Sequence, residues 1–331
     1  MYTQFYRLHG EPFLLTPDHK FYFDSSVHSQ AMAHLTYGIS RGEGFIVITG
    51  EVGAGKTTLV KRLCALVDTQ RILTAHVVTT RLDGVDLLRV VATAFGLVDI
   101  PADKSSILIR LQNFFEATLK HQCRALLIVD EAQNLPVAGL EELRMLSNFQ
   151  VKNLAPFQSF LVGQPQFRSV LSSPDLEQLR QRVVATYHLG PMNRQECGEY
   201  VIHRLQQVGW RSDPSFGAEA LDAIFTYTGG IPRRINTLCN RLLLLGYLDD
   251  LHHFTADDVE KVAADLETEL SGASEYDSTK LPANAAMHRV DDAIVERVDA
   301  LGRRLDRQEE FLKRIALAVR DFLSYGDSSR G

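Results

Sequence analysis

Apolar positions between Phe45 and Leu189 follow two alternating patterns. Short apolar runs bounded by turn residues are typical of buried strands, and the stretches between them repeat apolar residues at the spacing of amphipathic helices. Such alternation is typical of crossover units around a parallel sheet. We therefore predict an α/β fold, a five-stranded parallel sheet with helices on both faces. The expected strands cover residues 45–49, 72–78, 125–130, 160–163 and 184–189, and the expected helices cover 57–67, 85–95, 106–121, 140–147 and 176–182.

The strand pattern stops after Asn193. Amphipathic spacing continues to residue 270 and predicts a second domain that is all helical. Thr255, followed by Asp257 and Asp258, gives the last helix a hydroxyl cap and acidic residues near the positive end of its dipole. The four expected helices cover residues 194–208, 217–228, 232–247 and 255–270.

The region after residue 270 changes character. Residues 271–284 are rich in Ser, Gly, Ala and Pro, which indicates a linker. In residues 285–323, apolar side chains recur at alternating four- and three-residue spacing, a heptad seam that predicts pairing with another helix. Because Gln308 interrupts the seam and Gly302 lowers helix stability, a single helix folded back on the body is the alternative. The seam residues are Ile294, Val298, Leu301, Leu305, Leu312, Ile315, Val319 and Phe322.

Composition narrows the classes of function. With 45% apolar and 23% charged residues among 331, the chain has the balance of a globular protein of about two domains. No apolar run approaches the roughly 20 residues of a membrane-spanning helix. The N-terminus shows no secretory signal, so we expect a cytoplasmic protein. With a net charge of −6, the chain lacks the basic bias expected of a dedicated nucleic-acid binder. Four widely separated cysteines favour neither zinc nor a disulfide framework.

A phosphate-binding motif follows the first expected strand. Residues 50–57 match G-x-x-x-x-G-K-[ST] in full, directly before an expected helix. The glycines let backbone N–H groups curl around phosphate oxygens. We expect Lys56 to reach the β- and γ-phosphates of ATP and Thr57 to bind Mg²⁺. The expected nucleotide-binding residues here are Gly50, Glu51, Val52, Gly53, Ala54, Gly55, Lys56, Thr57 and Thr58.

Two carboxylates end the third expected strand. Asp130 and Glu131 follow the apolar run that begins at Ala125. Asp130, at the carboxyl end of its strand, is the expected partner of Thr57 in binding Mg²⁺ beside the nucleotide. Glu131 is the candidate base that orients the attacking water. The two motifs together predict an ATP-hydrolysing site.

The segment before the first expected strand is dense in aromatic residues. It carries polar side chains between its rings, unlike the regular patterns that follow it. Two interpretations remain open: the rings form a wall of the adenine pocket, or they pack on the edge of the sheet. The aromatic residues are Phe5, Tyr6, Phe13, Phe21, Tyr22 and Phe23.

Several motifs resemble those of one ATPase family. The motifs are residues 51–58, the Asp-Glu-Ala-Gln box at 130–133, Val-Gly-Gln-Pro at 162–165 and Gly-Gly-Ile-Pro-Arg-Arg-Ile-Asn at 229–236, joined by matches at 11–18 and 34–38. Over about residues 1–270 they are similar to the secretion-type AAA+ ATPases of the ExeA/GspA kind. Within that family the chain looks most like the ATPase associated with exosortase (XrtA)/PEP-CTERM and exopolysaccharide loci.

The resemblance implies further roles and a domain organisation. Gln164 matches the sensor 1 position, and Arg233 matches sensor 2, where it contacts the nucleotide. Arg182, or its neighbour Arg180, falls where such proteins place an arginine finger that acts on the next subunit, so a homo-oligomer is implied. The domains would be an N-terminal arm (1–44), an AAA+ domain (45–190), a helical lid domain (191–270), a linker (271–284) and a C-terminal helix (285–323).

Three functions fit these features. The first is a Mg-dependent ATPase that drives or switches an envelope protein in exopolysaccharide export or protein sorting, and that reaches the inner membrane through this partner. The second is a DNA-associated ATPase of the transposition or initiator type, which needs a basic stripe or an added DNA-binding domain. The third is an interaction scaffold locked by ATP. The presence of Glu131 favours the first.

Overall fold

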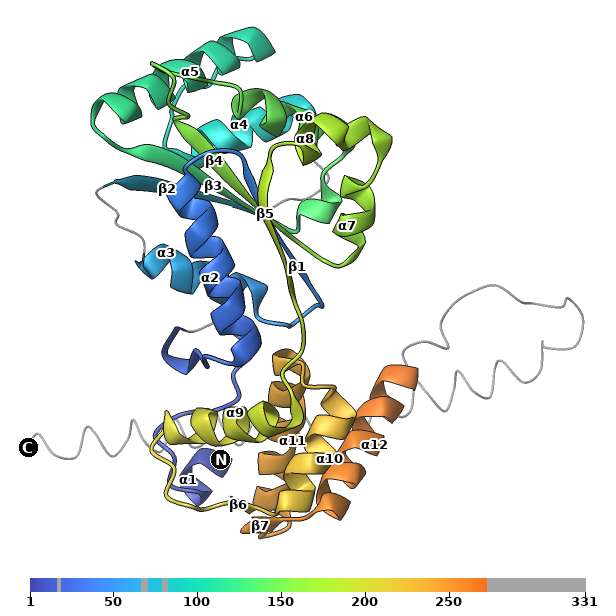
Figure 1. The fold of residues 1–331 in the computed structure, drawn as a ribbon. Helices are drawn as coiled ribbons and strands as arrows, with labels where there is room; N and C mark the ends of the chain where they lie inside the picture. The colour runs from blue at the N-terminus through green and yellow to red at the C-terminus, as the bar shows by residue number, and fades with distance from the viewer. Residues whose placement is uncertain (17–18, 67–70, 79–82, 273–331) are drawn as a thin grey trace, which may run out of the picture. The chain divides into compact units, whose positions relative to one another are not determined.

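Five parallel strands form the central sheet, in the order β2-β3-β4-β1-β5 (Figure 1). The structure is a computed structural model that describes residues 1–16, 19–66, 71–78 and 83–272. All five strands were predicted, and at least one helix lies between each strand and the next, as parallel pairing requires. The strands are β1 Phe45–Gly50, β2 Ile72–Val78, β3 Arg124–Asp130, β4 Phe157–Gly163 and β5 Val183–Leu189.

Strand β4 begins three residues before its predicted start because buried polar residues obscure its apolar pattern. Gln158 and Ser159 are both buried between Phe157 and Phe160. The Gln158 side-chain amide donates to the carbonyl oxygens of Gly38 and Glu43, at 2.9 and 3.0 Å. A buried amide is tolerated when its hydrogen bonds are made, and this one ties the sheet to the segment that enters β1.

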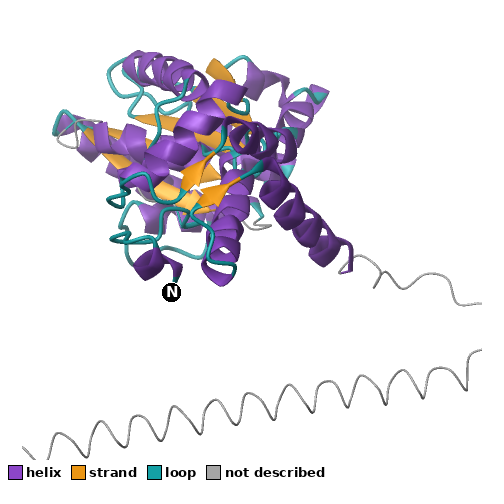
Figure 2. Cartoon of the chain, turned by 90° about the horizontal axis from the view of Figure 1, so that it is seen from below, coloured by secondary structure: helices purple, strands orange, loops and turns teal. Residues whose placement is uncertain are grey.

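Helices cover both faces of the sheet, and alternate strand residues point to opposite faces. Leu127 and Val129 contact the core under α4, α5 and α6, whereas Leu126 and Ile128 contact the core under α2 and α3. Seen from below, the strands lie among the helices (Figure 2). The helices are α2 Ser26–Arg41, α3 Lys56–Leu66, α4 Gly84–Ala94, α5 Lys104–Lys120, α6 Val137–Leu146, α7 Gln166–Leu171 and α8 Glu177–Arg180, with 3-10 turns at His19–Phe21, Ala132–Asn134 and Pro174–Leu176.

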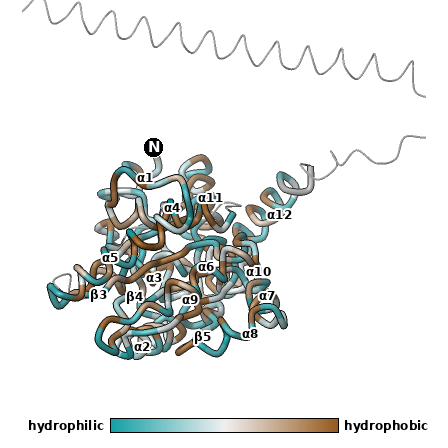
Figure 3. Tube along the Cα trace, turned by 90° about the horizontal axis from the view of Figure 1, so that it is seen from above, coloured by the Kyte–Doolittle hydropathy of each residue, from teal (hydrophilic) through white to brown (hydrophobic). Residues whose placement is uncertain are grey.

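Helix α2 is the main element that the sequence pattern missed. Its buried face consists of His28, Ala31, Leu35 and Gly38, so only one large aliphatic residue marks it. In Figure 3, α2 is less strongly hydrophobic than the central strands. A Cβ on Gly38 would lie 2.3 Å from the Cδ1 atom of Ile46, so the small residue lets the helix approach β1 closely.

Four helices and a short ladder form the helical region (residues 194–272). The predicted domain was all helical, but Ser215–Phe216 (β6) and His253–Phe254 (β7) pair as a two-residue parallel ladder. This ladder joins the loops that precede α10 and α12, where strand periodicity is too short to be recognised. The helices are α9 Arg194–Gln206, α10 Ala218–Thr228, α11 Pro232–Leu248 and α12 Ala256–Gly272.

The N-terminal segment (residues 1–16 and 19–23) packs on the helical region. Tyr6 and Phe13 are buried in the same core as α9, α11 and α12. The Tyr6 hydroxyl donates to the carbonyl oxygen of Leu251 at 2.8 Å, and Tyr2 at the start of α1 (Tyr2–Phe5) donates to Asn240. These rings therefore do not pack on the sheet edge.

The predictions for the linker and the heptad segment concern the part of the chain after the helical region. The heptad segment and all but the first two residues of the predicted linker lie outside the described residues; Ser271 and Gly272 end α12. Within the ranges that the structure describes, no helix has both the length and the apolar character needed to cross a membrane.

Candidate active site

The loop between β1 and α3 has the backbone shape that its glycines permit. Gly53 and Gly55 have φ angles of +85° and +98°, which side chains disfavour. A Cβ on Gly53 would lie 2.3 Å from the Cβ of Arg233, and one on Gly55 would lie 2.8 Å from the Nε2 of His28. Both glycines are therefore required by conformation and by close neighbours.

Lys56 is held inside this loop. Its Nζ donates to the carbonyl oxygens of Gly50 and Glu51, at 2.8 and 2.9 Å. Burial lowers the pKa of the Lys56 ammonium, and the negative charges of Glu131 and Asp130 oppose that shift. The loop therefore encloses a cation at the end of β1, next to two carboxylates.

The structure brings Thr57 and Asp130 together. Thr57 lies in the first turn of α3 and Asp130 ends β3, and the Thr57 hydroxyl donates to Oδ2 of Asp130 at 2.9 Å. Parallel strands end at one edge of the sheet, which explains how residues 73 positions apart meet. His76 of β2, which the sequence did not single out, places Nε2 3.9 Å from the same oxygen.

Glu131 has a left-handed backbone conformation, with φ 54° and ψ 40°. Its N–H donates to Oδ1 of Asp130 at 3.0 Å. Its Oε2 accepts hydrogen bonds from the side-chain amides of Gln133 and Gln164, the latter at 3.2 Å. The predicted base and the predicted sensor residue are thus in direct contact at the carboxyl edge of the sheet.

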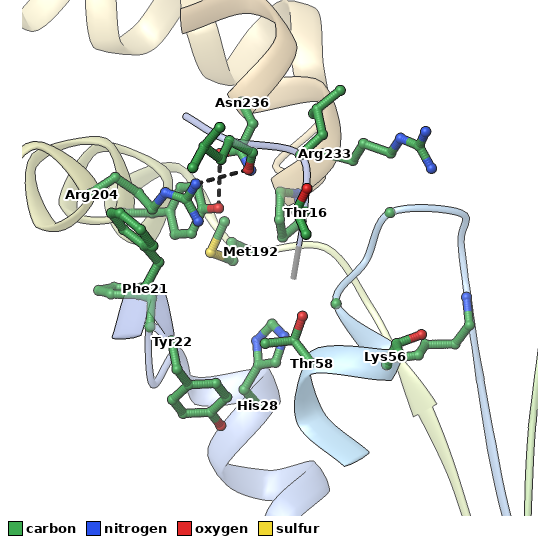
Figure 4. A pocket seen from close by; sticks show the side chains of 18 of the residues that line it. Thr16, Phe21, Tyr22, His28, Lys56, Thr58, Met192, Arg204, Arg233 and Asn236 are labelled. Atoms are coloured by element: carbon green, nitrogen blue, oxygen red, sulfur yellow. Dashed lines mark hydrogen bonds between the residues drawn. The ribbon is translucent and has the colours of Figure 1, made fainter. Parts of the chain in front are cut away.

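A pocket of about 220 Å³ opens beside the phosphate loop. Glu131 lines its end at the sheet. Figure 4 shows Met192 across the pocket from His28 and Thr58, and the Tyr22 ring lies beside His28, with 6.1 Å between the ring centroids. The pocket wall therefore comes from three parts of the chain: the loop, the N-terminal segment and the helical region. The wall includes Leu14, Leu15, Thr16, Phe21, Tyr22 and Phe23 from the N-terminal segment, and Met192, Tyr200, Arg204, Pro232, Arg233 and Asn236 from the region that follows the sheet.

Arg204 joins the N-terminal segment to α9. Its guanidinium donates to the carbonyl oxygens of Pro12 and Leu14, at 2.6 and 3.0 Å, and its carbon lies 4.3 Å from the centre of the Phe21 ring. The side chain is buried, so these bonds form in a medium where charge-assisted hydrogen bonds are strong. Figure 4 shows this side chain beside the pocket wall.

Arg233 lies at the start of α11. Its N–H donates to the carbonyl oxygen of Gly53 at 3.2 Å, which fixes the helix on the phosphate loop. The side chain is exposed and extends past the loop (Figure 4). Arg233 therefore lies beside the loop, and its expected contact with the nucleotide stays a prediction.

Arg180 and Arg182 lie away from this pocket. The carbonyl oxygen of Arg182 accepts the Phe45 N–H, which places it where β1 and β5 begin. The phosphate loop follows the opposite ends of these strands. Arg182 donates to the carbonyl oxygen of Ser147 at 3.1 Å, and Arg180 to that of Leu171 at 2.9 Å. The structure therefore does not bring either arginine to the phosphate loop of its own chain.

Comparison with known proteins identifies the domain. The family described as AAA domain matches residues 39–171. The chain has the P-loop AAA fold. General secretion pathway protein A from Aeromonas hydrophila is 37% identical over 270 residues, which cover 80% of this chain and 48% of that protein. The chain thus spans about half the length of this relative.

Solved structures share the fold of this AAA domain and the helical region. Cdc6p from Pyrobaculum aerophilum has a TM-score of 0.61 at 15% identity, covering 77% of this chain and 70% of its own. The ORC2 protein from Aeropyrum pernix, solved as ADPNP–ADP complexes, has a TM-score of 0.55 at 17% identity, covering 75% and 72%. At these identities the likeness concerns the fold, and the P-loop AAA fold implies nucleotide binding.

Sequence reasoning missed two residues of the pocket wall, His28 and Arg204. His28 of α2 lines the pocket, with its Nδ1 atom 2.7 Å from the Ser25 hydroxyl. Burial lowers the pKa of His28, and a hydrogen bond to the Ala54 backbone opposes that shift. Ser25, which directly precedes the 16 residues of α2, is a helix-capping residue type and was an available signal for the start of this helix. Nothing in the sequence indicated the partners of Arg204, which are backbone carbonyls.

Proposed function

We propose that this protein binds ATP with Mg²⁺ in the pocket beside the phosphate loop and hydrolyses it to ADP and phosphate. The observation that carries the proposal is the 2.9 Å contact between the Thr57 hydroxyl and Asp130. It joins the phosphate loop to the end of β3, and Glu131 lines the same pocket. A hydroxyl beside a carboxylate provides the oxygen ligands that Mg²⁺ prefers.

In this proposal the chain's own groups divide the work. The loop N–H groups and the Lys56 ammonium bind phosphate oxygens, and Thr57 and Asp130 hold the metal ion. Bound Mg²⁺ would neutralise charge on the phosphates. Glu131 orients a water and accepts its proton, a role that requires the fixed direction given by its hydrogen bonds. Arg233, fixed beside Gly53, acts from the helical region on the nucleotide.

In the same proposal, the N-terminal segment and the helical region bind the base of the nucleotide. Phe21, Tyr22 and Met192 offer apolar and aromatic surface to a planar base. Arg204 keeps the N-terminal segment against α9 and so maintains this wall. Nucleotide binding would therefore link three parts of the chain in one site.

Replacing Arg204 by Ala is expected to weaken ATP binding by about tenfold, because the wall formed by the N-terminal segment loses its anchor. It removes two charge-assisted hydrogen bonds and leaves two carbonyls without these donors. The expected loss of unfolding free energy is about 2–4 kcal/mol. A fluorescent ATP analogue measures the affinity, and urea unfolding measures the stability.

The matched control for this prediction is Arg241→Ala. Arg241 forms an exposed ion pair with Glu269 at 3.0 Å, and such pairs contribute less than about 1 kcal/mol. Equal losses of affinity in both variants would contradict the assigned role of Arg204.

We further propose that the ATP cycle drives or switches an envelope protein, in exopolysaccharide export or in protein sorting of the exosortase and PEP-CTERM type. The support is the 37% identity to General secretion pathway protein A and the motifs at residues 130–133 and 229–236. In this proposal the protein acts as a homo-oligomer, and Arg182 completes the site of the next subunit.

Two measurements test the proposed function. The purified chain should hydrolyse ATP only when Mg²⁺ is present, and Lys56→Ala should remove both nucleotide binding and turnover. In the source organism, Glu131→Gln in place of the unmodified chain should abolish polysaccharide export or surface protein sorting. Unaltered export with the Glu131→Gln chain would instead support an ATP-locked scaffold, and retention of the chain on duplex DNA with steep salt dependence would support the DNA-associated alternative.

A further inference from the structure

Gln133 occupies an unusual place next to the candidate base. It lies in the 3-10 turn Ala132–Asn134, directly after Glu131. Its Oε1 accepts the backbone N–H of Gln164 at 3.0 Å, and its Nε2 donates to Oε2 of Glu131. One side-chain amide therefore bridges the end of β3 and the residue that follows β4.

The orientation of this amide follows from its partners. The Gln164 N–H can only donate, so it must face the carbonyl oxygen of the Gln133 side chain. The NH₂ group then faces the Glu131 carboxylate, which accepts. The hydrogen-bond chemistry thus excludes the flipped amide, in which both contacts would be repulsive.

A neighbouring glycine makes room for this arrangement. A Cβ on Gly163, the last residue of β4, would lie 3.0 Å from Oε1 of Gln133 and 3.1 Å from the Cβ of Phe167. A larger residue at position 163 would push the amide away from the Gln164 N–H. The end of β4 is therefore shaped to hold Gln133.

Glu131 needs such support because its own backbone is strained. The left-handed conformation costs roughly 1–2 kcal/mol for a residue with a side chain, so the surrounding contacts must maintain it. The amides of Gln133 and Gln164 both donate to Oε2, and the Glu131 N–H donates to Asp130. These bonds fix the direction of the carboxylate at the edge of the pocket.

We propose that Gln133 is a positioning residue for ATP hydrolysis, which anchors Oε2 of Glu131 so that the carboxylate faces the attacking water. This inference rests on the proposed function of the same site. Gln133 acts through Glu131 and does not itself bind the nucleotide, so its loss lowers the rate of the chemical step and leaves the binding of ATP as it is. Because Gln133 also holds the Gln164 N–H, it keeps the base and the sensor residue in one unit.

The test compares Gln133→Met with the unmodified full chain. Methionine has a similar length and fills the same space but cannot make either hydrogen bond. A misplacement of about 1 Å at a reacting group costs about 10²-fold in rate, so we expect kcat to fall by about 10²-fold with ATP affinity within about twofold. Thermal unfolding is measured in parallel to exclude a loss of folding.

The matched control is Gln166→Ala. Gln166 is exposed, and its Nε2 lies 3.5 Å from Oε1 of Gln164. The kcat of the Gln166→Ala variant should equal that of the unmodified chain. The double variant Gln133→Met/Gln164→Ala should also lose less kcat than the product of the two separate fold-reductions, because both residues act on the same carboxylate oxygen.

The outcomes separate this inference from the proposed function. Absence of Mg-dependent turnover in the unmodified chain would contradict both. Turnover in the unmodified chain with an unchanged kcat in Gln133→Met would overturn the positioning role alone. A weaker ATP affinity at unchanged kcat would also overturn it, since a residue that merely maintains the pocket gives that result.

Discussion

Replacing Glu131 by Gln is expected to lower the turnover number for ATP by about 10²- to 10⁴-fold, the usual contribution of a positioned general base. The substitution keeps the shape of the side chain and removes its ability to accept a proton. Lys56, Thr57 and Asp130 are unchanged, so ATP should bind as before. Steady-state phosphate release measures turnover, and titration with a fluorescent analogue measures binding.

Glu141→Gln is the control for the Glu131 variant. Glu141 lies on α6, where its carboxylate pairs with Arg144 at 2.7 Å, outside the candidate site. The Glu141→Gln variant should retain the full turnover number for ATP. A Glu131→Gln chain that hydrolyses ATP at the rate of this control would show that another group activates the water.

Replacing Arg182 by Ala is expected to lower turnover by about 10³- to 10⁵-fold in the assembled protein, the range measured for arginine fingers. Arg182 precedes β5, whose seven residues span roughly 20 Å at about 3.3 Å each. This length separates Arg182 from the edge of the sheet where its own phosphate loop lies. In the proposed homo-oligomer Arg182 would therefore act on the nucleotide of a neighbouring subunit, and each monomer should be nearly inactive alone.

Mixing two inactive variants tests this arrangement. An Arg182→Ala subunit has an intact site, and a Lys56→Ala subunit has an intact finger, so contacts between them should restore part of the turnover. Arg180→Ala, made in parallel, decides which of the two arginines acts. No restoration in any mixture would refute action between subunits, because the two defects would then lie in one site.

The sequence predicted those features that depend on residues close together in the chain. The five strands, the phosphate loop and the Asp130-Glu131 pair each form a continuous pattern, and parallel topology brings their ends to one edge of the sheet. Arg233 was placed through its family motif and is indeed fixed beside Gly53. The roles given to these residues remain predictions.

The features that the sequence missed depend on contacts between distant segments. Arg204 is buried against carbonyl groups 190 and 192 positions away, and backbone carbonyls leave no trace in a sequence. The predicted start of β4 was wrong because the side chain of Gln158 is buried. A sequence pattern that treats polar residues as exposed does not assign such a residue to a buried strand. His28 was hidden because its helix buries mainly small residues.

The position of the N-terminal segment also has a consequence for synthesis of the protein. Tyr6 and its acceptor Leu251 lie 245 residues apart. At typical ribosome speeds of 5–20 residues per second, the aromatic side chains near Met1 wait for about 10 to 50 s before their final neighbours emerge. During that interval a chaperone or another nascent chain can cover them. A fluorescent tag fused before Tyr2 would stand at the edge of this late-forming core.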